Sequence, residues 1–437
     1  MIAVGHLLLA ASLAASAPAG PRALPWIEDD YAKALSQARA KDLPIFVENW
    51  APWCHTCRSM RAFVFTDKAL AKHAGQFVWL SIDTEKAQNV PFVLKYPIRA
   101  WPSLYVIDPH KETVVLRWVG GATVDQLRKL FAEGRRAAGG GGPGADASVA
   151  RADALYGQGK YEEAAKAFRE ALPLLAAKSA SYGRVTESLL YALSMLGRHA
   201  ECVDLARETL PRLRGTASEA NLAASGLDCA LALPKENAGR APDVAALEKA
   251  ARAALDDPKL RLLADDRSAV YSVLVSARED AKDEAGAKAL AREWVANLDA
   301  EAARVKTAEQ RTALDPNRLS ADEAAGDIAK AVPMLEASER DFPQDYNPPA
   351  RLAYVFLQLK RFDDALAAND RALAKVYGPR RIRVLLVRSD IYAAKADAAA
   401  AKKTLEDALS FARALPEGQR SDSQIASLQK RLEAPAP

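Results

Sequence analysis

Two cysteines separated by two residues are the clearest candidates for chemistry in this sequence. Cys54 and Cys57 enclose His55 and Thr56 and follow a β-rich run that ends near Trp50. A helix is expected to open at Cys54, where unpaired N–H groups and the helix dipole stabilise a thiolate. Cys54 is therefore the predicted nucleophile. Cys57, one turn further on, can attack a mixed disulfide and release the product.

The histidine inside the motif bears on the direction of this chemistry. Positive charge on His55 beside the Cys54 thiolate favours the reduced form and makes the pair more oxidising. The alternative is half of a zinc site, because cysteine and histidine are also metal ligands. The sequence has no second ligand pair at zinc spacing. A redox pair is therefore favoured, with no metal and no cofactor beyond the Cys54–Cys57 disulfide itself.

The residues around the cysteines resemble the active-site strand and loop of the thioredoxin superfamily. The likeness runs from Phe46 to Cys57 and is greatest to exported thioredoxin-like domains of the type found at the C-terminus of DsbD, with Phe65-Thr66-Asp67 adding to it. It covers roughly residues 26 to 135. The resemblance implies an α/β thioredoxin-like fold, thiol–disulfide oxidoreductase activity of the protein-disulfide reductase or isomerase type, and protein substrates with thiols or disulfides.

The resemblance also assigns roles to residues outside the motif. Glu48 lies six residues before Cys54, where thioredoxins keep a buried acid that relays a proton to the inner cysteine. The alternative is an ordinary exposed carboxylate on the strand. Pro102 matches a cis-proline that faces the cysteines, and Trp101 replaces the small or β-branched residue common before it. Trp53 and Trp101 could form an apolar docking surface.

His55 and Thr56, between the two cysteines, are assigned to redox tuning. Gly120-Gly121 matches the glycine loop of the family, where a partner backbone can approach closely, and a plain turn is an equal alternative.

Alternating and helical runs predict the elements that position these residues. The strand-like runs are Ile45–Val47, Phe77–Ile82, Ser103–Ile107 and Val114–Trp118, and the helical runs are Asp29–Lys41, one opening at Cys54, and Asp125–Arg136. This order predicts a small α/β domain over residues 26–136. A glycine-rich linker is expected at 137–147.

From residue 148 to 434 the sequence predicts an all-α solenoid of helical hairpins. The spacing of small and aromatic residues resembles a tetratricopeptide repeat, at Ala152, Gly159, Tyr161, Ala164, Phe168 and Ala171, and again around Lys360. Five to seven helix pairs are expected, with turn-rich stretches at Asp315–Ser320 and Phe342–Pro349 dividing the array. The repeats are expected to bind a protein or peptide ligand. A non-repeat helical bundle is the alternative.

Two further groups of residues have competing interpretations. Cys202 and Cys229 could form a disulfide, but Cys202 occupies a slot for a small buried residue, so a packed free thiol is favoured and the pairing stays open. The basic cluster at Arg380, Arg381 and Arg383 could meet an acidic partner, although a solvated helix face is favoured.

The start of the chain and its charge bear on location and partners. Residues 1–19 read as a signal peptide with cleavage after Ala19, although no basic residue precedes Arg22. Export, to the bacterial periplasm, as a soluble protein is expected, with a membrane or periplasmic electron partner. The formal net charge of +4 over 437 residues gives no case for nucleic-acid binding.

Two functions remain for comparison with the structure. The favoured one is an exported thiol–disulfide oxidoreductase whose repeats recruit a protein partner. The alternative is an interaction scaffold in which the thioredoxin-like fold is a non-catalytic recognition module. The direction of electron flow is left open.

Overall fold

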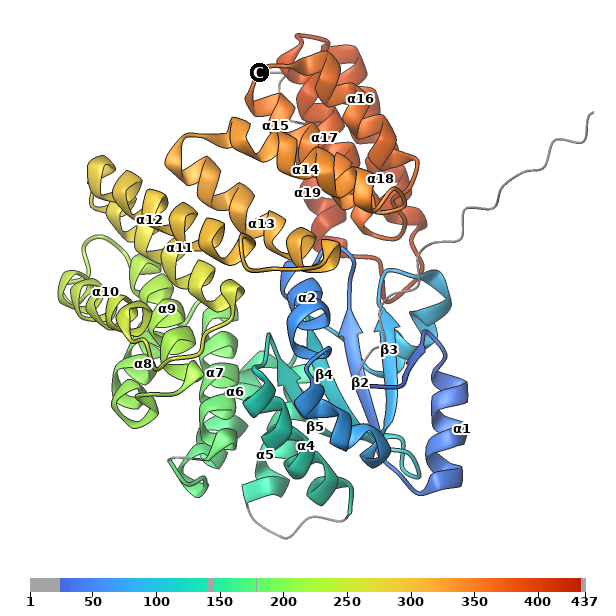
Figure 1. The fold of residues 1–437 in the computed structure, drawn as a ribbon, viewed down its shortest axis with the longest axis vertical. Helices are drawn as coiled ribbons and strands as arrows, with labels where there is room; N and C mark the ends of the chain where they lie inside the picture. Colours follow the sequence, from blue (N-terminus) through green and yellow to red (C-terminus); the bar gives the residue numbers. More distant parts are fainter. Residues whose placement is uncertain (1–23, 140–144, 178, 434–437) are drawn as a thin grey trace, which may run out of the picture.

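The computed structural model describes residues 24–139, 145–177 and 179–433 (Figure 1). These form a sheet domain, Leu24–Gly139, and a helical array, Ala145–Glu433. The predicted signal peptide, residues 140–144 of the predicted linker and residue 434 lie outside the described residues. Helix α4 (Val124–Ala138) extends into the range expected for the linker, and α5 begins at Ala145.

The sheet domain is built on one five-stranded sheet with the order β1-β3-β2-β4-β5. Strands β1, β2 and β3 pair in parallel, β4 pairs antiparallel with β2, and β5 pairs antiparallel with β4. The bounds are β1 Trp26–Glu28, β2 Ile45–Trp50, β3 Val78–Asp83, β4 Ser103–Asp108 and β5 Thr113–Val119. The four predicted strands are present, and β1 is an addition because three residues are too few for a periodic pattern.

Helices cover both faces of this sheet. They are α1 (Tyr31–Lys41), α2 (His55–Ser59) continued by a π-helical turn (Met60–Val64), a 3₁₀ helix (Lys68–Gln76), α3 (Val90–Lys95) and α4. Side chains of a strand alternate between faces. Phe46 of β2 packs with Met60 and Phe131 on the face of α2 and α4, whereas Val47 packs with Ala34 of α1 on the other.

The helical array is a series of antiparallel helix pairs followed by α19. The predicted hairpins are present, and seven successive pairs occur in the described residues, at the upper end of the expected range. The helices are α5 Ala145–Gly157, α6 Tyr161–Ala171, α7 Ala180–Met195, α8 His199–Leu213, α9 Ala217–Ala232, α10 Arg240–Asp256, α11 Ala264–Asp280, α12 Glu284–Ala302, α13 Ala308–Ala325, α14 Ala331–Asp341, α15 Asn347–Gln358, α16 Phe362–Leu373, α17 Arg380–Ala394, α18 Ala398–Ala414 and α19 Asp422–Glu433.

The residues of the first repeat signature lie where the pattern predicts. Ala152, Ala164, Phe168 and Ala171 are fully buried between α5 and α6, and Gly159 adopts a positive φ of 74° in the turn. At such a φ a side chain would be strained, which explains a glycine at this turn.

Two expectations for the array are corrected. Asp315–Ser320 is not a turn but lies inside α13, although Pro316 removes one backbone donor there. Cys202 of α8 and Cys229 of α9 form a disulfide, so the favoured free thiol was wrong. Cys202 occupies the repeat position for a small buried residue, and this position faces α9. The spacing of residues in the sequence does not reveal that Cys229 lies opposite it.

The array curves around the sheet domain, beginning beside β5 and ending near β3, with α13 beside α2 (Figure 1). Its first contact with β5 comes from a buried ion pair within the array, Arg184–Asp153. Arg184 of α7 donates through Nη1 to Asp153 Oδ1 of α5 at 2.9 Å and to the backbone oxygen of Arg117 in β5 at 2.7 Å. Because these charges are buried, they depend on one another, and they anchor the array to the edge strand.

Candidate active site

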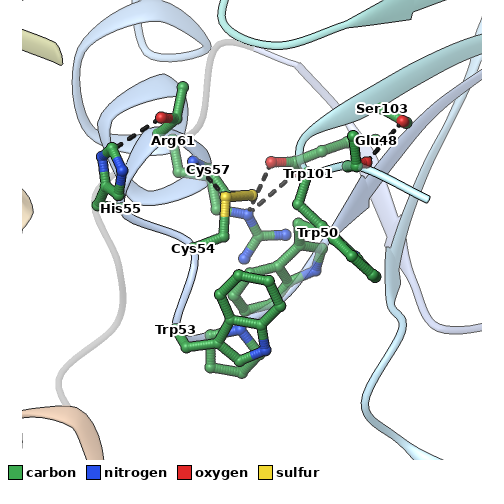
Figure 2. Close-up of a disulfide and its surroundings, with 12 residues drawn as sticks. Glu48, Trp50, Trp53, Cys54, His55, Cys57, Arg61, Trp101 and Ser103 are labelled. Atoms are coloured by element: carbon green, nitrogen blue, oxygen red, sulfur yellow. Dashed lines mark hydrogen bonds and ion pairs between the residues drawn. A yellow bond between two sulfur atoms is a disulfide. The ribbon is translucent and has the colours of Figure 1, made fainter. Parts of the chain in front are cut away.

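The predicted cysteine pair forms a disulfide at the junction of β2 and α2 (Figure 2). Cys54 is the N-cap residue of α2, and its Sγ accepts a hydrogen bond from the backbone N–H of Cys57 at 3.1 Å. Cys54 is 4% exposed and Cys57 is fully buried. The outer sulfur is therefore the one that a substrate can reach, and a backbone donor already points at it to stabilise a thiolate.

The tryptophan and proline expected opposite the cysteines form one wall of this site. The Trp101–Pro102 peptide bond is cis, as the resemblance predicts. The Trp101 ring meets the Trp53 ring edge to face with centroids 5.2 Å apart, and both pack against Cys54 and Cys57. Trp101 Nε1 donates to Thr84 Oγ1 at 2.8 Å. These contacts hold two half-buried aromatic rings beside the reactive sulfur.

Glu48 lies on the sheet face beneath α2 and is 1% exposed, so the exposed-carboxylate alternative is wrong. Its carboxylate accepts from Arg61 Nε at 3.2 and 3.0 Å. The Arg61 guanidinium also lies 3.6 Å from the ring centroid of Trp50 and donates to Ser81. Sequence reasoning missed Arg61. Its place four residues after Cys57, on the same helical face, was the available signal.

The helical array reaches the motif itself. Asp265, in the first turn of α11, places Oδ1 3.1 Å from His55 Nδ1, and Asn317 of α13 donates to the same oxygen. Burial disfavours the charged carboxylate, but the hydrogen bond and charge of His55 hold the pKa of Asp265 below its usual value. Next to it, a Cβ on Gly121 would approach Thr56 to 3.1 Å and Leu263 to 3.9 Å. The glycine loop thus faces the array.

A second group of array residues holds the other side of the motif. Arg58 Nη1 lies 2.5 Å from Asp345 Oδ2, and Asn347 Nδ2 donates to the backbone oxygen of Pro52 at 3.0 Å. Burial opposes ionisation of Asp345, but Arg58 and hydrogen bonds from Asn347 hold its pKa below its usual value. The loop before Cys54 and the helix after it are therefore both tied to residues almost 300 positions away.

The basic cluster at the start of α17 has a partner within the chain. Arg380 lies over the Trp53 ring, 5.2 Å from its centroid, and its backbone N–H donates to Glu85 Oε2 at 2.8 Å. Trp53 Nε1 donates to the other oxygen of Glu85 at 2.9 Å. Burial raises the pKa of Glu85, and these two donors oppose the rise. The expectation of a solvated helix face is wrong for Arg380 and fits the exposed Arg383.

Among the described residues, no group of three or more histidine, cysteine or acidic side chains is placed to hold a metal ion. None of the helices described here is both long and apolar enough to cross a membrane.

Comparison with known proteins assigns both parts of the chain. Residues 26–109 match a family model described as thioredoxin-like, and residues 323–385 match a tetratricopeptide repeat model. The chain carries a thioredoxin-like domain and tetratricopeptide repeats. The sheet domain holds the first match, and the helical array holds the second.

Curated relatives match the thioredoxin-like domain. Thioredoxin M4 of Arabidopsis thaliana chloroplasts is 35% identical over 91 residues, 21% of this chain and 45% of that protein. Thiol:disulfide interchange protein DsbD of Pseudoalteromonas atlantica is 27% identical over 82 residues, 18% of this chain and 14% of that protein. Protein disulfide-isomerase 1 of Dictyostelium discoideum is 29% identical over 84 residues. This chain thus spans less than half the length of these relatives.

The chain also has matches among solved structures of tetratricopeptide repeat proteins. A tetratricopeptide repeat protein from Parabacteroides merdae covers 67% of this chain and 100% of its own length, at 10% identity and a TM-score of 0.40.

With thioredoxins, DsbD and disulfide isomerases among the relatives and a Cys54–Cys57 pair at the helix start, the thioredoxin-like domain supports thiol–disulfide oxidoreductase chemistry in general.

Proposed function

We propose that this protein is an exported thiol–disulfide oxidoreductase that acts on protein substrates through Cys54 and Cys57. The observation that supports this most is the geometry of the pair. The sulfur of Cys54 faces an aromatic wall and accepts a backbone N–H, while Cys57 is fully buried behind it. An outer nucleophile and a protected inner thiol are what two-step exchange needs, because the mixed disulfide must be resolved before it escapes.

In the reducing direction, the Cys54 thiolate attacks one sulfur of a substrate disulfide. A Cys54–substrate bond forms, the substrate disulfide breaks, and the leaving sulfur takes a proton. Cys57 then loses its proton and attacks the Cys54 sulfur, which closes the Cys54–Cys57 disulfide and releases the second substrate thiol. Two electrons pass from the pair to the substrate. The reverse sequence oxidises a substrate dithiol, and a dithiol donor or disulfide acceptor restores the pair.

Glu48 is the proposed proton acceptor for Cys57 in the second step. Its burial beneath α2 places a carboxylate on the correct face of β2. The ion pair with Arg61 holds this carboxylate in position beneath α2.

Trapping tests the catalytic proposal. Cys57→Ala leaves Cys54 able to attack but unable to be released, so disulfide-linked partners should accumulate and disappear on treatment with dithiothreitol. Cys54→Ala/Cys57→Ala is the matched control and should trap none. The unsubstituted protein should also accelerate insulin reduction by dithiothreitol.

The scaffold alternative makes the opposite prediction. It requires no acceleration of insulin reduction, no trapped partners, and partner binding that Cys54→Ser/Cys57→Ser leaves unchanged. That set of results would replace the catalytic proposal with a recognition module.

Export to the bacterial periplasm is part of the proposal, supported by the apolar start of the chain and by DsbD among the relatives. A reducing role there would need a membrane or periplasmic electron partner. Fractionation of cells that express the full chain tests this. The mature protein should be found in the periplasmic fraction and lack residues 1–19.

We also propose that the tetratricopeptide repeats recruit a protein or peptide partner. The side of the array around α13 packs against the thioredoxin-like domain, so recruitment uses surface that remains free of this contact. A pull-down with the Cys54→Ser/Cys57→Ser chain separates this role from catalysis. Partners that still bind would be held by the repeats, and loss of all binding would contradict recruitment.

A further inference from the structure

The contact between His55 and Asp265 joins the redox motif to a carboxylate of the array. His55 is half-exposed, with 49% of its side chain accessible, whereas the Asp265 side chain is 4% exposed. Asn317 donates to the same Oδ1 that meets His55. Asn317 fixes the Asp265 carboxylate from within the array, so the carboxylate offers the half-exposed imidazole an acceptor at a defined position.

The imidazole is directed away from the sulfur that it would influence. In Figure 2 the His55 ring is turned away from the Cys54 and Cys57 sulfurs. Its Nδ1 lies 3.1 Å from Asp265 Oδ1 and 3.3 Å from Thr56 Oγ1. A protonated His55 that pairs with the Asp265 carboxylate stabilises the Cys54 thiolate only weakly, because an ion pair has nearly zero net charge at a distance.

The other charges around the motif are paired elsewhere. Arg58, one turn further on, is matched by Asp345. The side chain of Asp266, next to Asp265, accepts from the backbone N–H of Leu263 at the start of α11. Across the domain contact, the Asp265 carboxylate pairs with His55.

We propose that Asp265 is a positioning residue for the redox pair. Its carboxylate holds the His55 imidazole away from Cys54 and neutralises its charge, so the docked array makes the pair more reducing than the Cys-His-Thr-Cys motif alone. This proposal rests on the proposed function, because both concern the Cys54–Cys57 disulfide. It also resolves the direction that the motif left open, since His55 by itself favours an oxidant.

The electron count shows where this charge acts. A dithiol such as dithiothreitol gives two electrons to the Cys54–Cys57 disulfide and becomes a cyclic disulfide. The protein S–S bond breaks, Cys57 takes one proton, Cys54 remains a thiolate, and the second proton goes to solvent. The thiolate is the species that an imidazolium stabilises, so an unpaired His55 would favour the reduced protein and raise the potential.

The test is the equilibrium of the full chain with graded thiol buffers at pH 7. Asp265→Asn should release His55 and shift the equilibrium about tenfold toward the reduced protein, which is about 30 mV. His55→Ala/Asp265→Asn removes both members of the pair and should return to within about threefold of the unsubstituted chain. Asp243→Asn, an acid paired with Arg207 inside the array, is the matched control and should shift nothing.

Two results would overturn the proposal. One is an Asp265→Asn equilibrium within about twofold of the unsubstituted protein, and the other is a shift that persists undiminished in the double variant. A purely structural role for Asp265 predicts lower stability without this His55-dependent shift.

A measurement on the unsubstituted chain covers the case in which Asp265→Asn does not fold. NMR of the His55 ring nitrogens at pH 7 compares the oxidised and the reduced protein. The ring signals should change little on reduction, and a large change would mean that the ring senses the thiolate directly. Neither test needs a protein substrate, so a chain inactive toward insulin could still confirm this inference.

Discussion

The two disulfides of this protein are the same bond in two different surroundings. Cys202–Cys229 joins α8 to α9, and its cysteines are 0% and 1% exposed within the main core of the array. Cys54–Cys57 closes one turn at the start of α2, with Cys54 4% exposed and polar groups from both domains around it. Reactivity in such bonds depends on access and on what stabilises the leaving thiolate.

The comparison shows that the fold assigns the roles of the four cysteines. Cys202 and Cys229 lie in a buried hydrophobic cluster, so a thiolate there would be disfavoured and the bond closes a loop of the chain. Around Cys54 a backbone N–H, a half-exposed histidine and two tryptophans meet. One bond is suited to stabilising the array, and the other is suited to exchange.

The largest expected difference is in the rate of reduction. Under native conditions dithiothreitol should reduce Cys54–Cys57 at least about 10³-fold faster than Cys202–Cys229, because the latter needs local unfolding of a buried helix pair. Differential alkylation with mass spectrometry measures both rates in one sample. In strong denaturant the gap should close, and equal rates in the folded protein would contradict the division of roles.

Removal of each bond should give opposite results. Cys202→Ala/Cys229→Ala should lower the free energy of unfolding by about 3 kcal/mol, because the closed loop restricts the unfolded chain, and should leave insulin reduction unchanged. Cys54→Ala/Cys57→Ala should abolish exchange and cost less stability, since the loop it closes is short. Urea titration and the insulin assay measure the two effects. A stability loss that accompanies only the second variant would reverse the assignment.

The role of the buried acid separates the two sites further. Glu48→Gln should slow resolution of the mixed disulfide about tenfold, because Cys57 then loses its nearby proton acceptor. Single-turnover kinetics across pH measure this, and the loss should shrink as pH rises and solvent deprotonates Cys57 directly. Reduction of Cys202–Cys229 in denaturant serves as the control and should be unaffected. A loss independent of pH would point to disrupted packing with Arg61.

The smallest expected effect concerns the array residue over Trp53. Arg380→Ala should cost about 0.5–1 kcal/mol of stability through the lost cation–π contact and should change the fluorescence of Trp53. Arg383→Ala, an exposed neighbour, is the control and should change neither quantity. An unchanged tryptophan signal in Arg380→Ala would show that this contact does not persist in solution.

Much of the sheet domain could be predicted because its signals are local. The strand runs around Phe46, Leu80 and Tyr105 alternate or are continuously apolar, and all three strands are present. Repeat spacing predicted the buried faces of α5 and α6 in the same way. Strand β1 could not be predicted, because its three residues carry too little pattern and it forms by pairing with β3. The helical state of Asp315–Ser320 could not be predicted either, because packing of α13 outweighs the effect of Pro316.

The residues of the candidate site also divide into those that the sequence predicted and those that it did not. The motif, the helix start, Glu48 and Pro102 are separated by at most 54 residues, and the resemblance to the thioredoxin superfamily placed them together. Asp265, Asp345 and Arg380 had no signal that linked them to the motif, because they are ordinary charged residues of the helical array. Arg61 lies on the helical face of Cys57, and sequence reasoning missed that signal.

The sequence by itself determined the redox pair, the thioredoxin-like and repeat architecture, and the residues that line Cys54 from within its own domain. Only the tertiary structure decided that Cys202 and Cys229 pair, that the array curves back onto the active site, and that His55 meets Asp265. The physical reason is that periodicity encodes which side of an element is buried, whereas the contact between elements 210 residues apart depends on the summed geometry of every helix between them.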